Sequence, residues 1–171
     1  MRTVLEYFPP ETLRPGDAIF LNDSFLGSGH FPDCFMASPV FAEKTLVGFV
    51  VNAAHHIDVG GAAPGSQRVH GVTESFQEGL RILPIRLVHE GTFDPDLLRM
   101  ILANVRIPEK VEGDLNAQLN ANRAGSERLS NLFKEYGATL LDRACEDILA
   151  ASETRMRELI KQIPDGIYSF E

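Results

Sequence analysis

The spacing of the apolar residues changes near residue 93, and this change constrains the fold more than any other feature of the sequence. Before that point the apolar runs are short, rich in Val, Ile and Phe, and bounded by Gly, Pro, Asn or Asp, as is typical of β-strands. They occupy residues 18–21, 34–40, 46–54 and 80–88. Beyond it, apolar residues recur every three or four positions, the period of an amphipathic α-helix. We therefore predict an α+β fold with a β-rich segment over 1–92 and a helical segment over 93–171.

Three helices are expected in the second segment. Asp94 is a favoured N-cap and Pro95 fits a first turn, so a helix is predicted to begin there. Two longer helices are predicted at about 108–136 and 139–163, separated by Gly137. Two long helices joined at one glycine predict a long antiparallel helical hairpin, whose apolar stripes are expected to be core or interface.

The acidic composition narrows the classes of function. The 171 residues include 16 Lys and Arg against 24 Asp and Glu, a formal net charge of -8. No basic cluster offers phosphates a binding surface, so we expect neither a nucleic-acid partner nor a membrane partner. The sequence shows no apolar membrane span or signal-peptide core, and its two cysteines, Cys34 and Cys145, lie far apart. These features predict a reduced, cytoplasmic protein.

Two His-x-x-Asp doublets flank the second and third apolar runs: His30 with Asp33, and His55 with Asp58. The polar link between these runs predicts a hairpin that turns at Lys44. Such a hairpin places Asp33 opposite His55, and His30 near Asp58. Opposed residues have Cβ atoms about 5 Å apart, close enough for both side chains to reach one cation.

A metal site is one interpretation of these doublets. Asp23, just after the first apolar run, could join them. Histidine and carboxylate ligands without thiolate suit Mn, Fe(II), Zn or Ni, and such a cation can polarise a carbonyl or activate water to attack an amide. Turn and cap hydrogen bonding by His and Asp in loops is the alternative, and residue spacing alone leaves both open.

Several other residues have a structural and a functional interpretation. Alternation along the strand directs Cys34 away from Asp33, which predicts a buried, inert thiol, and directs His56 away from His55, which predicts a structural or supporting role. Glu78 is a candidate acid/base group if it is not simply solvated. The polar side chains of the second helix predict a solvated face or a polar groove; they are Asn116, Asn120, Asn122 and Arg123.

The sequence resembles the hydantoinase B family. That family comprises the B subunits of N-methylhydantoinases, the corresponding half of ATP-dependent 5-oxoprolinases and the alpha subunits of acetone carboxylases. The resemblance spans nearly the whole chain and implies an internal segment from the N-terminal half of a longer family member. Its matching segments include Asn22-Asp23, Gly29-His30 with Asp33, Ala54-His55-His56 with Asp58-Val59-Gly60-Gly61, Gln77-Glu78-Gly79 and Gly113-Asp114-Leu115.

The resemblance implies a metal-dependent subunit of an ATP-driven amidohydrolase. A hydantoinase A-type partner subunit would use the ATP, and this chain would help to open a cyclic amide such as a hydantoin or 5-oxoproline, within a hetero-oligomer. Residues 60–67 are consistent with ATP use by the partner subunit, because this glycine-rich stretch lacks the lysine of a phosphate-binding loop. A divalent metal (Mn, Fe or Zn) is implied at His30, Asp33 and His55, with Asp23 as a fourth ligand. Glu78 is expected to assist the leaving nitrogen.

Two alternatives stay open. The acetone carboxylase branch has a further His two positions before the first ligand, where this chain has Ser28, and this departure argues against that branch. The other alternative is a non-catalytic assembly module, in which the helical hairpin docks a partner and the His and Asp side chains only cap loops.

Overall fold

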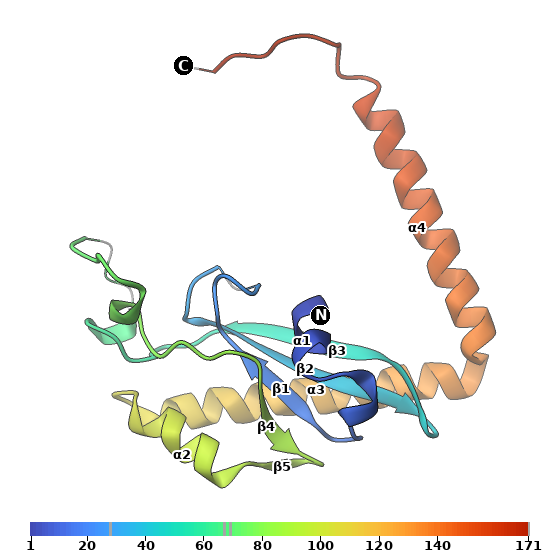
Figure 1. Cartoon of the computed structure of the whole chain (residues 1–171). Helices are drawn as coiled ribbons and strands as arrows, with labels where there is room; N and C mark the ends of the chain where they lie inside the picture. The colour runs from blue at the N-terminus through green and yellow to red at the C-terminus, as the bar shows by residue number, and fades with distance from the viewer. Residues whose placement is uncertain (28, 67, 69, 171) are drawn as a thin grey trace. The chain divides into compact units, whose positions relative to one another are not determined.

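The computed structural model describes residues 1–27, 29–66, 68 and 70–170, which fold as two units (Figure 1). The first unit is Met1–Asn131, and the second is Leu132–Glu171. The strands lie between Ala18 and Phe93 and the long helices follow them, so the predicted α+β class is confirmed. As a domain boundary, the division at residue 93 stays a prediction.

A five-stranded antiparallel sheet forms the centre of the first unit, with the strand order β3-β2-β1-β4-β5. The strands are β1 (Ala18–Leu21), β2 (Asp33–Ala42), β3 (Thr45–His55), β4 (Ile85–His89) and β5 (Thr92–Phe93). The first three match the predicted runs within two residues. The fourth does not, because the strand expected from residue 80 begins only at Ile85.

The side chain of Asn22 explains the late start of β4. Its Nδ2 donates to the carbonyl oxygens of Phe31 and Leu80, and its Oδ1 accepts a hydrogen bond from the Ile82 amide. Asn22 is fully buried, so these bonds satisfy backbone groups that a longer strand would have paired in the sheet. The segment before Ile85 is thereby held at the end of β1 without strand pairing.

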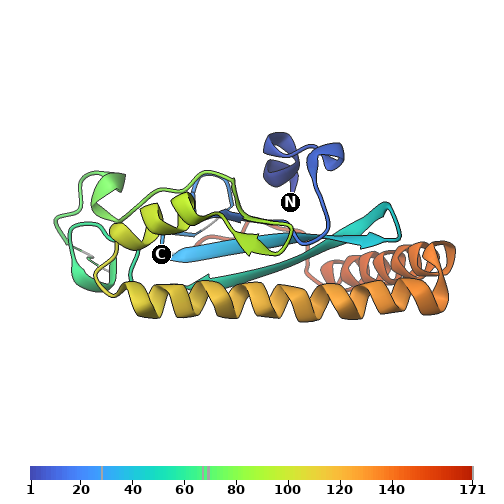
Figure 2. The ribbon, with the colours of Figure 1, turned by 90° about the horizontal axis from the view of Figure 1, so that it is seen from below.

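Both faces of β1 are covered. Ala18 and Phe20 point into the larger core, which is packed with residues from α2 (Pro95–Ala103) and α3 (Pro108–Tyr136). Ile19 and Leu21 point to the other face, where the N-terminal segment with α1 (Arg2–Tyr7) covers them. Figure 2 shows α3 running alongside the sheet. The alternation of side chains along a strand explains why every residue of β1 is buried.

Amide side chains fasten α3 to the sheet. Gln118 Nε2 donates to the Cys34 carbonyl oxygen and to Asn52 Oδ1, and Asn122 Nδ2 donates to the Met36 carbonyl oxygen. Asn122 is fully buried. Of the two alternatives predicted for Asn122, the solvated face is therefore wrong, because polar groups of strands β2 and β3 satisfy its amide.

The helix boundaries agree closely with those predicted. Asp94 Oδ1 accepts hydrogen bonds from the amides of Asp96 and Leu97, as expected of an N-cap. In the second unit, α4 (Ala138–Ile160) has no buried residue, so its apolar stripe and Cys145 are not core. The antiparallel packing of the two long helices stays a prediction. Within the described residues, none of the helices combines the length and apolar character needed to cross a bilayer.

Candidate metal centre

The β2–β3 hairpin has the register predicted from the sequence. Asp33 is paired with His55, and the pairing continues without a shift to Val40 opposite Gly48. A bulge follows Val40, and the chain turns at Glu43 and Lys44. The hairpin therefore places an aspartate and a histidine side by side at its open end.

His30 completes a three-residue group with Asp33 and His55. Asp33 Oδ1 lies 3.0 Å from His55 Nδ1 and 3.2 Å from His30 Nε2. The two histidine nitrogens are 3.2 Å apart, and the rings stack with centroids 4.9 Å apart. Gly29 permits this approach, because a Cβ at its position would lie 3.1 Å from Asp33 Oδ2. In the part of the chain that the structure describes, these side chains form a group with the composition of a metal site.

The separations of the three ligand atoms fit one divalent cation. Ligands held at about 2.0–2.2 Å from an ion are about 2.8–3.6 Å apart when the coordination angles lie between about 90° and 110°. The three observed separations, 3.0, 3.2 and 3.2 Å, fall in that interval. Two imidazoles and one carboxylate suit Mn, Fe(II) or Zn.

The charge state and exposure of the group also suit a ligand site. The hydrogen bond with His55 holds the pKa of the Asp33 carboxyl below its usual value, against the opposing effect of desolvation, so it is ionised at neutral pH. The side chains of His30, Asp33 and His55 are 39%, 36% and 41% exposed. The group is therefore accessible to an ion and to a further ligand.

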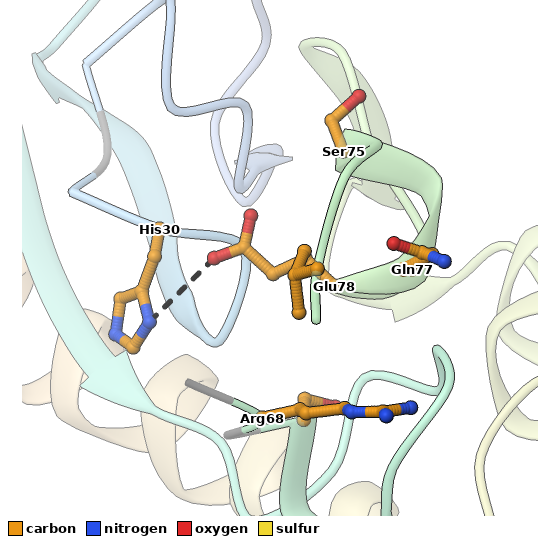
Figure 3. Close-up of a pocket in the computed structure, with 7 residues that line it drawn as sticks. His30, Arg68, Ser75, Gln77 and Glu78 are labelled. Carbon is orange, nitrogen blue, oxygen red and sulfur yellow. Dashed lines mark ion pairs between the residues drawn. The ribbon is translucent and has the colours of Figure 1, made fainter. Parts of the chain in front are cut away.

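Glu78 lies next to the three-residue group. Its Oε1 is 3.7 Å from His30 Nδ1, the ring nitrogen that faces away from Asp33 (Figure 3). Glu78 follows a short 3₁₀ turn, Ser75–Gln77. His30 and Glu78 line a cavity of about 460 Å³, whose other walls are formed by Ser66, Arg68, Val72, Ser75 and Gln77.

Asp58 takes no part in the group. Its carboxylate is buried and accepts hydrogen bonds from the Arg106 amide (2.6 Å) and from Arg106 Nη1 (2.9 Å). His30 contacts Asp33, His55 and Glu78, and its predicted proximity to Asp58 stays a prediction. The loop after β3 turns inward, and the buried carboxylate is neutralised by an arginine distant in sequence.

Asp23 is also buried, and it forms an ion pair with Arg81. Its other carboxylate oxygen accepts a hydrogen bond from the Phe25 amide. It lies outside the His30, Asp33 and His55 group of the described residues. Its predicted role as a fourth ligand stays a prediction.

His56 supports the strand beside the group. It is buried, and its Nε2 is 2.8 Å from Gln118 Oε1 on α3. Burial lowers the pKa of its imidazole, although the hydrogen bond with Gln118 opposes that effect. A structural or supporting role for His56 is predicted from its place on the strand, whereas the place of Gln118 in its helix gives no sign of this contact.

The chain is similar to several known proteins. The family model described as hydantoinase B/oxoprolinase matches residues 1–171. The B-type subunit of a putative D-/L-hydantoinase from Pseudomonas sp. (strain NS671) is 35% identical over 161 residues, 94% of this chain and 27% of the relative. 5-Oxoprolinase 1 from Arabidopsis thaliana is 28% identical over 171 residues, 93% of this chain and 13% of the relative.

Two solved structures share the fold. The ATP-dependent caprolactamase from Pseudomonas jessenii matches 97% of this chain and 28% of its own chain, with a TM-score of 0.86 and 32% identity. A nucleotide-free acetone carboxylase matches 78% of this chain and 17% of its own, with a TM-score of 0.67 and 25% identity. The chain thus spans less than a third of the length of these relatives. Because the family model matches residues 1–171 of this chain, the chain belongs to the hydantoinase B/oxoprolinase family.

Proposed function

We propose that this chain is the metal-bearing part of an ATP-dependent amidohydrolase, which hydrolyses the C–N bond of a cyclic amide together with an ATP-using partner subunit. The observation that carries the proposal is the convergence of His30, Asp33 and His55, with ligand atoms 3.0–3.2 Å apart beside a cavity. The names of relatives supply the reaction class, since they include a hydantoinase, a 5-oxoprolinase and an ATP-dependent caprolactamase.

The three side chains would hold one divalent cation, with Asp33 supplying the negative charge and the imidazoles acting as neutral ligands. When bound, such an ion polarises a carbonyl or lowers the pKa of a water molecule. Asp33 is suited to this role because its carboxyl is ionised at neutral pH. Asp23 would have to leave Arg81 to become a fourth ligand, so the proposal depends on the other three.

Glu78 is proposed to donate the proton that the leaving nitrogen requires. Its carboxylate lies on the cavity wall, 3.7 Å from His30 Nδ1, and its side chain is 26% exposed. A carboxyl group at the edge of the cavity can give a proton to the departing amine and then take up another proton from solvent. The same contact also orients the His30 ring, as carboxylates beside ligand imidazoles commonly do.

The hydantoinase A-type partner, the use of ATP by that partner, the hetero-oligomer and the cytoplasmic location all stay predictions. The partner is supported by relatives named as subunits of larger enzymes, among them the B-type chain of a hydantoinase and the beta chain of a caprolactamase. An acetone-carboxylase-like reaction is a second candidate, supported by the structural match to acetone carboxylase. Ser28, which argued against that branch, lies outside the described residues.

The proposal is tested by asking whether a cyclic amide binds beside the metal. Bound Mn²⁺ broadens the NMR signals of protons close to it, so hydantoin and 5-oxoproline are mixed with the Mn²⁺-loaded chain. We expect ring-proton broadening that Asp33→Asn abolishes and His89→Ala, a matched histidine variant outside the group, preserves. Equal broadening with the parent chain and with Asp33→Asn would contradict the proposal.

A further inference from the structure

The cavity beside His30 has a second charged wall, which Arg68 forms. In Figure 3 the Arg68 side chain lies below Glu78, and the two come from separate segments of the loop region. Glu78 directs its carboxylate toward His30, 3.7 Å away. The cavity therefore has a carboxylate on the side of the metal ligands and a guanidinium on another side.

Arg68 differs from three other arginines of the first unit in its surroundings. Those three each pair with a buried aspartate: Arg81 with Asp23, Arg86 with Asp17 and Arg106 with Asp58. Among residues 1–27, 29–66, 68 and 70–170, no carboxylate lies within salt-bridge distance of Arg68. Its charge is thus uncompensated by the described part of the fold, in a chain whose net charge is -8.

The loop holds the guanidinium in a defined orientation. Arg68 Nε donates a hydrogen bond of 2.9 Å to the His70 carbonyl oxygen. Gly71 has a φ of +73°, and a Cβ at its position would lie 3.4 Å from Arg68 Nη2. A turn that favours glycine therefore passes beside the terminal nitrogens without a side chain to crowd them.

We propose that Arg68 binds an anionic group of the substrate, a carboxylate or a phosphoryl group, while the reacting amide faces His30, Asp33 and His55. This inference rests on the proposed function, because it assigns the second end of the same cavity. A guanidinium offers paired N–H donors that match the oxygens of either anion.

An anion site at Arg68 narrows the substrate class to cyclic amides that carry an anionic group. A cyclic amide that carries an acid group, such as 5-oxoproline, would use both ends of the cavity. A neutral lactam such as 2-pyrrolidinone has the same ring and lacks the carboxylate, so it would gain nothing from Arg68. Discrimination between these two compounds is therefore the property that Arg68 is expected to confer.

Calorimetric titration of the Mn²⁺-loaded chain tests the inference with three probes: 5-oxoproline, 2-pyrrolidinone and inorganic phosphate. The variants are Arg68→Gln, Arg68→Lys and the matched control Arg99→Gln, which removes an exposed arginine on α2. We expect Arg68→Gln to weaken the binding of 5-oxoproline about tenfold or more, because a charge-assisted hydrogen-bond pair is lost. Arg68→Lys should recover part of the affinity, and Arg99→Gln should change nothing.

The probes separate the two sources of the anion. Loss of 5-oxoproline affinity in Arg68→Gln identifies a carboxylate, and loss of phosphate affinity alone identifies a phosphoryl group. If neither anion binds in an Arg68-dependent manner, or if 2-pyrrolidinone loses as much affinity as 5-oxoproline, the inference is overturned. Metal content is measured on the same samples, so a chain that binds metal without Arg68-dependent anion binding refutes this inference alone. Arg68-dependent anion binding without metal refutes the proposed function alone.

Discussion

Asp33 and His55 occupy opposed positions of the β2–β3 hairpin, and His55 Nδ1 lies 3.0 Å from Asp33 Oδ1. Their proximity follows from backbone pairing, so the hairpin brings together two of the three side chains of the candidate metal centre. His30 is brought to the same point by the loop that precedes β2. Because a preorganised site loses little conformational freedom on binding, this arrangement favours high affinity for the ion.

Replacing Asn122 is expected to loosen α3 from the sheet. Asn122→Ala removes the hydrogen bonds of a fully buried amide with the Met36 carbonyl oxygen and with Asn52 Nδ2, which should lower the free energy of unfolding by about 1–3 kcal/mol. Asn116→Ala removes an exposed amide from the same helix and should change the stability by less than about 0.5 kcal/mol. Urea denaturation followed by circular dichroism measures both. Equal stabilities of the two variants would contradict the proposed role of the amide network.

Two glycines should respond in opposite directions to alanine. At Gly61, where φ is +78°, a Cβ would lie 2.5 Å from the Gln77 carbonyl oxygen, so Gly61→Ala should destabilise the chain by about 2 kcal/mol or more. At Gly113, within α3, a Cβ meets nothing within 4 Å, so Gly113→Ala should stabilise it by about 0.5–1 kcal/mol. Thermal unfolding of both variants gives the sign of each effect. A stable Gly61→Ala variant would mean that the loops at 61 and 77 do not pack as described.

The two thiols should differ in reactivity. Cys34 is buried, and burial raises the pKa of its thiol, whereas Cys145 is exposed on α4. Because the thiolate is the reactive form, a short treatment of the native chain with iodoacetamide should label Cys145 and spare Cys34. Peptide mass spectrometry identifies the labelled residue, and labelling in urea provides the unfolded control. Rapid labelling of Cys34 in the native chain would contradict the burial of its side chain in the larger core.

Glu78→Gln should slow ring opening without lowering the metal content of the chain. If Glu78 transfers a proton to the leaving nitrogen, its loss should lower the turnover rate by about 10² to 10⁴-fold in the complex with the ATP-using partner. The pH–rate profile should also lose one of its limbs, which a purely orienting role would not cause. Glu112→Gln, an exposed carboxylate on α3, serves as the control. Unchanged turnover at saturating metal would rule out the acid/base role.

The parts of the fold that depend on local pattern could be predicted from the sequence. The register of Asp33 and His55 follows from two apolar runs placed symmetrically about Lys44, and Asp94 is a local N-cap signal. Both depend on residues close together in the chain. Local spacing therefore sufficed for the Asp33–His55 pair and for the helix starts, whereas the full set with His30 was implied by the family resemblance.

The features that sequence reasoning missed depend on residues far apart in the chain. Asp58 pairs with Arg106, 48 positions away, and Gln118 reaches the Cys34 carbonyl oxygen, 84 positions away. The late start of β4 depends on Asn22, 60 positions before Ile82. The periodicity of a strand or helix cannot predict these hydrogen-bond and ion-pair partners, because they depend on how separate elements pack together.

Metal content measured by mass spectrometry tests the central claim most directly. The chain is loaded separately with Mn, Fe(II) and Zn and then desalted, beside Asp33→Asn, His55→Ala and the control His89→Ala, all checked for folding. The account predicts about one ion per chain in the parent and in His89→Ala, and loss of that ion in the other two variants. A parent chain that retains none of the three ions, or an Asp33→Asn variant that retains as much as the parent, would contradict it.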